Sequence, residues 1–177
     1  MQLLLFTVIL LMRAANLLSS NDDIRWSAER KLTYSDFAGS APISSPWVAN
    51  TSSNIYFSYD FNNDQLHEIT AYSSFTPSKS WMKKKIPEVL HHEQLHFDIT
   101  ELYARKLYVD ASKLIGQRGN TNQLKQLFKD ANTECNEMQN QYDEESNHGV
   151  NEEKQIEWEN RIKQLLENTP AYPTGLR

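Results

Sequence analysis

The residues with the clearest capacity for chemistry are two histidines spaced four apart, with a glutamate directly after the first. His92, Glu93 and His96 form the pattern His-Glu-x-x-His. On an α-helix the two histidines lie one turn apart and within about 40° of each other. Two imidazoles in this arrangement can bind one zinc ion, and the glutamate can take a proton from a water that the zinc activates.

A catalytic zinc site requires a third protein ligand and one open position. The nearest carboxylates on the same helix do not qualify. Asp98 is rotated by about 200° from His96, and Glu101 by about 140°, so neither faces the metal while the helix stays regular. The third ligand must therefore come from another part of the chain.

His148 is the favoured third ligand, because it is the only histidine downstream of the motif. It stands beside Gly149, which is typical of the end of a helix. Two antiparallel helices with a short connection would bring that end back towards His92. We therefore expect His92, His96 and His148 to bind zinc and Glu93 to act as general base. The competing ligands are carboxylates of the same predicted helix: Glu134, Glu137, Asp143 and Glu144.

Three helices are predicted in the C-terminal half of the chain. Pro87 suits a first helical turn, and apolar residues recur at helical spacing from there to Leu114. This first helix carries the histidine motif. Asn120 or Thr121 can cap a second helix, and Asn151 can cap a third.

The segment before these helices has the composition of a small sheet. Residues 54–61 are aromatic and β-branched with near-alternation, a turn signal follows at 62–64, and residues 66–75 resume as a second strand. Residues 24–32 can supply another short strand. The sequence thus predicts the α+β class, with a small antiparallel sheet followed by three helices, one of them a zincin-like active-site helix.

Composition limits the classes of function. The chain has 177 residues, of which 39% are hydrophobic and 23% charged, with a mean hydropathy of -0.66. These values indicate one globular domain. The net charge of -5 argues against a nucleic-acid partner, because such a surface must neutralise phosphates. The single cysteine, Cys135, excludes an internal disulfide and a cysteine-based metal site.

The N-terminus predicts export. An apolar run at 3–12 is followed by small and polar residues, a pattern typical of a secretory signal peptide. We assign 1–20 to the signal and 21–177 to a single domain that is secreted or periplasmic, with retention at the membrane if the signal is not cleaved. No stable membrane span is expected after its removal. The alternative is a buried N-terminal core helix.

Several segments together are similar to a family of exported bacterial proteins, domain of unknown function 922, for which zinc-dependent protease activity is predicted. The matching segments are 32–37, 80–81, 90–99 with Glu101 and Arg105, and 142–149 with Gln155 and Trp158. This resemblance implies a zincin-like fold and export, and it supports a functional role for His148. Leu95 departs from the family, since many relatives have glycine there.

These observations predict an exported metallopeptidase that hydrolyses a peptide or protein substrate. Zinc would activate a water, and Glu93 would deprotonate it and pass the proton to the leaving amine. The free edge of the predicted strand at 69–75 could pair with an extended substrate. Two alternatives remain open: a non-catalytic exported module that binds zinc or a partner, and a zinc hydrolase that acts on a non-peptide amide.

Overall fold

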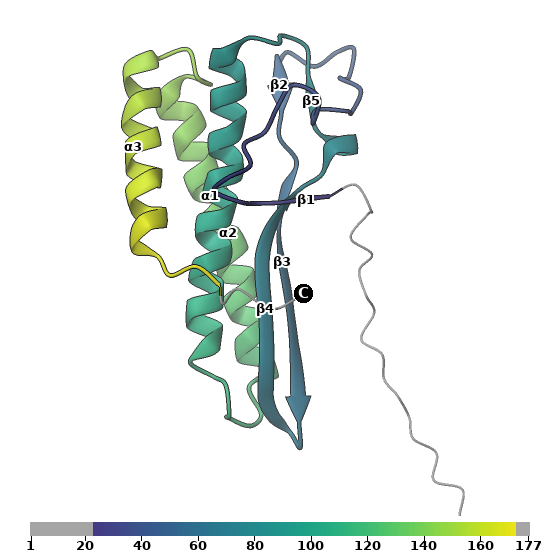
Figure 1. Cartoon of the computed structure of the whole chain (residues 1–177), viewed down its shortest axis with the longest axis vertical. Coiled ribbons are helices and arrows are strands. Elements are labelled where there is room, and N and C mark those ends of the chain that lie inside the picture. Colours follow the sequence, from purple (N-terminus) through teal and green to yellow (C-terminus); the bar gives the residue numbers. More distant parts are fainter. Residues whose placement is uncertain (1–22, 173–177) are drawn as a thin grey trace, which may run out of the picture.

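The computed structural model describes residues 23–172, so the predicted signal peptide at 1–20 lies outside the described residues. Figure 1 shows the sheet on one side of the molecule and the helices on the other, with α1 (Pro87–Ser112) between the sheet and the other helices. The small antiparallel sheet precedes the three helices in the described chain, as the sequence predicts, and the fold belongs to the α+β class.

Two antiparallel sheets are present in the described residues. The larger has the strand order β1-β4-β3 and the smaller pairs β2 with β5. The strands are β1 (Ile24–Arg25), β2 (Ala49–Asn50), β3 (Ser53–Asn62), β4 (Gln65–Phe75) and β5 (Trp81–Met82), and a short 3-10 helix, η1 (Pro77–Lys79), precedes β5. The predicted strand within 24–32 is reduced to the two residues of β1.

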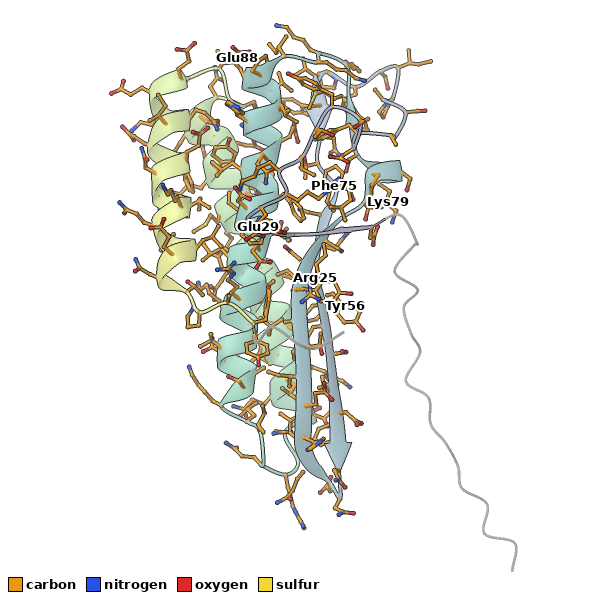
Figure 2. The ribbon with its side chains drawn as sticks, in the orientation of Figure 1. Arg25, Glu29, Tyr56, Phe75, Lys79 and Glu88 are labelled. Atoms are coloured by element: carbon orange, nitrogen blue, oxygen red, sulfur yellow. The ribbon has the colours of Figure 1, made fainter. Side chains whose placement is uncertain are left out.

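The hairpin of β3 and β4 turns where the sequence predicts. Asn63 and Asp64 have φ angles of 50° and 63°, the left-handed conformation that a two-residue hairpin turn requires and that these residue types tolerate. On the face turned away from α1, Tyr56 stacks on Tyr72, and the guanidinium of Arg25 lies 4.4 Å from the Tyr72 ring centre. Arg25 and Tyr56 lie close together beside the sheet in Figure 2.

The helices begin and end close to the predicted positions. α1 starts with Pro87, whose missing N–H is not needed in a first turn. α2 (Thr121–Ser146) and α3 (Glu152–Asn168) follow. The side chain of Asn151 accepts a hydrogen bond from the Lys154 amide, which confirms it as the cap of α3.

The core fills the space between the sheet and the helices. Its largest fully buried apolar side chains come from the sheet, α1, α2 and α3: Leu66, Phe75, Phe97, Ile99, Leu124, Tyr142, Trp158 and Ile162. No helix within residues 23–172 has the length and apolar character needed to cross a membrane. Because core side chains from the sheet, α2 and α3 pack against α1, they fix the position of this helix and of the functional groups on it.

Candidate metal centre

The first half of α1 places the histidine motif in the interior, near the helix end where Figure 2 labels the exposed Glu88. His92 and Glu93 are buried, with 6% and 5% of their surface exposed. The Nε2 atoms of His92 and His96 lie 3.1 Å apart. This is the convergence that a spacing of one helical turn predicts.

Asp143 on α2 completes a cluster with these histidines. Its Oδ1 atom lies 3.0 Å from His92 Nε2 and 3.1 Å from His96 Nε2. The three ligand atoms lie within 4.8 Å of one another. Because α1 and α2 are antiparallel neighbours, the last turn of α2 meets the first turns of α1. Asp143 is one of the four carboxylates that the sequence offers as competitors of His148.

His148 lies at the edge of this cluster. Its Nδ1 atom is 3.4 Å from Asp143 Oδ1, and its side chain is 45% exposed. Its ring packs against the indole of Trp47 with centroids 4.4 Å apart. The structure thus brings His148 to the site, but the group of mutually close ligand atoms has Asp143 as its third member. Zinc binding by His148 stays a prediction.

The turn after α2 determines where His148 lies. Asn147, His148 and Gly149 all adopt left-handed conformations, with φ angles of 49°, 52° and 78°. At Gly149 a Cβ atom would stand 3.0 Å from Cγ of His92, closer than ordinary packing allows. Glycine is therefore favoured there, both by the left-handed conformation and by the His92 ring against it.

The charges in the cluster stabilise one another. Burial by itself would raise the pKa of Asp143, but hydrogen bonds with His92 and His96 and their positive charge outweigh it and hold that pKa well below its usual range. Burial by itself would lower the pKa of His96, but the Asp143 hydrogen bond and the charges of Glu93 and Asp143 raise it above its ordinary value. The site therefore favours an anionic Asp143 and attracts positive charge.

The ligand atoms fit the dimensions of a zinc site. Zinc binds histidine nitrogen and carboxylate oxygen at about 2.0–2.2 Å, so the ligand atoms of a tetrahedral site stand roughly 3.3 Å apart. The separations in the cluster are 3.0 and 3.1 Å. Shifts of a few tenths of an ångström would suffice, and the two-imidazole, one-carboxylate donor set is one that zinc takes.

Glu93 supplies a second reason to expect a ligand. Its Oε2 atom is buried and has no hydrogen-bond partner within residues 23–172. A buried carboxylate oxygen without a partner is destabilising, and native proteins keep few of them. The same side chain lines the cavity that contains the three ligand atoms. A ligand in that cavity would satisfy it.

The family comparison covers the three converging ligand residues, Glu93 and His148. Residues 47–149 match the model of a family described as a bacterial protein of unknown function, DUF922. The chain belongs to this family. The DUF922 match begins at Trp47, ends at Gly149 and leaves α3 outside it. Neither the search of curated proteins nor the search of solved structures finds a match.

The DUF922 segment also forms the cavity of the site, which has a volume of about 290 Å³. The lining includes the ligand residues and Glu93. The other described lining residues come from the segment around β2 and from the start of α1, and four of these six are apolar: Trp47, Val48, Ala49, Asn50, Thr51 and Val89. Trp47 is half-exposed at the rim, so part of its indole remains free to contact a ligand.

Behind the ligands lies a layer of buried polar side chains. The Tyr142 ring stacks on His92 at 4.7 Å, and its hydroxyl donates to Gln155 Oε1 at 2.6 Å. Burial raises the pKa of Tyr142 far above its usual range. Tyr142 therefore forms part of the wall behind His92 and does not offer its hydroxyl to the cavity.

The remaining residues of interest lie away from the cluster. His67 and His91 are exposed and take no part in the cluster. Asp98 accepts hydrogen bonds from the Trp26 indole and from Gln94, which attaches the N-terminal segment to α1. Asp143 is one of four competing carboxylates in the sequence, and only the packing of α2 on α1 shows that it is the one that faces the histidines.

Proposed function

We propose that this protein is an exported zinc-dependent metallopeptidase. His92, His96 and Asp143 would hold the metal, with His148 beside them, and Glu93 would be the general base. The observation that carries the proposal is the buried, unpartnered oxygen of Glu93 beside three converging ligand atoms. A metal with a purely structural role would not explain why a buried carboxylate oxygen beside it has no hydrogen-bond partner.

Zinc bound at these ligands would act as a Lewis acid and lower the pKa of a coordinated water towards about 7. Glu93 would accept the proton from that water and return it to the leaving amine. Its position directly after His92 fixes it on rigid helical backbone. The Thr51 hydroxyl donates to the Glu93 carbonyl at 3.3 Å, which links this turn of α1 to the loop after β2.

The free edge of β2 favours a peptide as the substrate. The Val48 carbonyl accepts from the Lys83 amide at 2.7 Å, on the side of β5. Backbone groups alternate in direction along a strand, so the peptide groups of Ala49 face the opposite side, which no described strand covers. An extended peptide could pair there, along the cavity wall. β4 cannot take this role near the site, because β1 and β3 flank its residues 74–75.

A second candidate function is a non-catalytic zinc-binding module. The observation in its favour is the 3.4 Å separation of His148 Nδ1 from Asp143 Oδ1, since a small movement could add a fourth protein ligand. A metal site closed by four protein ligands is typical of structural zinc. A zinc hydrolase acting on another amide would use the same groups as the peptidase.

The test combines zinc content with hydrolysis of an unfolded casein substrate. We expect Glu93→Gln to retain one zinc per chain and lose about 10²- to 10⁴-fold in rate, the range that a general base contributes. Glu88→Gln is the matched control, because Glu88 is an exposed glutamate of the same helix. Full activity in Glu93→Gln would reject the mechanism. Zinc-loaded wild type without activity on peptides would favour the non-catalytic module.

A further inference from the structure

We propose that Gln139 and Gln155 are positioning residues that orient the two imidazoles and fix which ring nitrogen carries the proton. The inference rests on the proposed function, since it assigns an orienting partner to each histidine ligand. The two glutamines come from different helices, α2 and α3, and each meets the Nδ1 side of one ring. Gln155 lies outside the DUF922 match, so the site extends beyond that segment.

Gln139 has its amide orientation fixed by its own donors. Its Nε2 group donates to the His96 carbonyl at 2.8 Å and to the Thr100 hydroxyl at 3.2 Å. These bonds leave Oε1 as the atom that faces Nδ1 of His96, with which it forms a close hydrogen bond. Because an amide oxygen can only accept, Nδ1 of His96 must carry a proton.

Gln155 repeats this arrangement at the other ring. Its Nε2 group donates to Glu159 at 3.0 Å, and its Oε1 accepts from the Tyr142 hydroxyl at 2.6 Å. The same oxygen lies 3.4 Å from Nδ1 of His92. The longer separation makes this the weaker of the two contacts. Tyr142 compensates in part, since its ring packs against the face of His92.

A proton on Nδ1 determines the state of Nε2 in each of the two rings. When Nδ1 holds the proton of a neutral imidazole, Nε2 presents its lone pair. Both Nε2 atoms face Asp143 Oδ1, which is itself an acceptor, so three electron-pair donors meet within 3.1 Å. A positive charge stabilises that convergence, either as a second proton on one imidazole or as a metal ion bound by all three atoms. The glutamines thus prepare the histidines for a metal and, in a neutral ring, disfavour the tautomer that carries its only proton on Nε2.

The experiment compares two substitutions of Gln139. Gln139→Met keeps the length of the side chain and removes the acceptor, whereas Gln139→Glu keeps an acceptor and removes the donated bonds. We expect zinc affinity, measured by competition with a chelating dye, to fall about 10- to 100-fold in Gln139→Met, the usual cost of losing such a partner. Gln139→Glu should recover most of that loss. Gln126→Met, an exposed glutamine of α2, should match wild type.

The two substitutions separate the bond that Gln139 accepts from the bonds that it donates. If Gln139 acted only through the bonds that it donates, Glu and Met would weaken zinc binding equally, and that result would overturn the proposal. Wild-type affinity in Gln139→Met would also overturn it. Circular dichroism establishes that each variant is folded. Gln155→Met should show a smaller loss than Gln139→Met, in keeping with its longer contact.

A measurement on unmodified protein does not depend on any variant. In zinc-loaded wild type, labelled with nitrogen-15, both rings should show a protonated Nδ1 and a metal-bound Nε2. Coordination through Nδ1 at either ring would contradict the proposal. Wild type that binds zinc and hydrolyses no peptide would remove only the peptidase activity. Wild type that binds no zinc would overturn both.

Discussion

Helix α1 carries two buried polar clusters that differ in how completely their atoms are paired. In the first, Glu101 accepts from Arg105 at 2.8 Å, from the Ser73 hydroxyl at 2.8 Å and from the Tyr172 hydroxyl at 3.0 Å. Arg105 also donates to the Leu166 carbonyl at 3.0 Å. Both oxygens of this carboxylate are satisfied, and the cluster joins the sheet, α1 and the chain after α3.

The second cluster lies two turns earlier, around Glu93. That residue is buried like Glu101, yet its Oε2 atom has no partner in the described part of the chain. Its neighbours His92 and His96 point their Nε2 atoms at one carboxylate oxygen. Pairing, more than burial, therefore separates a carboxylate that stabilises the fold from one that is available for chemistry.

The largest effect on stability is expected at the paired cluster. Glu101→Gln keeps the shape of the side chain but leaves the buried guanidinium of Arg105 without a countercharge. Breaking a buried ion pair in this way costs about 3–5 kcal/mol. Urea denaturation should show a loss of this size in the free energy of unfolding. A loss below about 1 kcal/mol would mean that pairing does not distinguish the two clusters.

A smaller loss is expected where the fold closes over the second cluster. Gly149→Ala places a Cβ 3.0 Å from the His92 ring and forces alanine into a left-handed conformation. We expect a cost of about 2–3 kcal/mol and weaker zinc binding. Gly116→Ala is the matched control, since its φ of 82° is similar and a Cβ there meets no described atom within 4 Å. It should cost about 1 kcal/mol. Equal losses would show that the contact with His92 is unimportant.

Replacing glutamate by glutamine should change the free energy of unfolding in the opposite direction at Glu93. Glu93→Gln replaces an unsatisfied buried carboxylate with a neutral amide of the same shape. We expect metal-free protein to keep its free energy of unfolding or gain up to about 1 kcal/mol. Urea denaturation after removal of metal with a chelator measures this free energy of unfolding. A loss of several kcal/mol would assign Glu93 a structural role and remove the contrast between the clusters.

The smallest effect concerns Cys135, a buried polar group without charge. Burial raises its pKa to about 11. The folded state holds the thiol proton more tightly than the unfolded state, so the protonated thiol contributes to the free energy of unfolding. This contribution is complete below pH about 8.5 and is lost as the pH rises through about 11. Alkylation by iodoacetamide at pH 8 should be roughly 100-fold slower than for an exposed cysteine. Alkylation at the rate of an exposed thiol would contradict its burial.

The sequence predicted those features that depend on local periodicity. The helix that carries His92 and His96, the turn at Asn63 and Asp64, and the cap at Asn151 all depend on neighbouring residues, and all occur in the structure. β2 and β5 could not be predicted in this way. Each has only two residues, and each forms because the other is held beside it.

The site shows the same limit. The spacing of His92 and His96 fixes their relative position on one helix. Asp143 depends on the rotation of α2 against α1, and an acidic surface helix with several carboxylates does not reveal that rotation in its sequence. The partners of the rings were also hidden, because Gln139 and Gln155 resemble any exposed helical glutamine until the packing of three helices is known.

That His92, His96 and Asp143 together bind one zinc ion is our proposal for this site. Its most direct test is the zinc content and affinity of purified protein, by mass spectrometry and chelator competition, in wild type, Asp143→Asn and Glu144→Gln. Glu144 is the exposed neighbour of Asp143 and serves as control. We predict one zinc per chain in wild type and Glu144→Gln, and at least tenfold weaker binding in Asp143→Asn. Wild type without stoichiometric zinc would show that the cluster is not a zinc site, and unchanged affinity in Asp143→Asn would show that Asp143 is not a ligand.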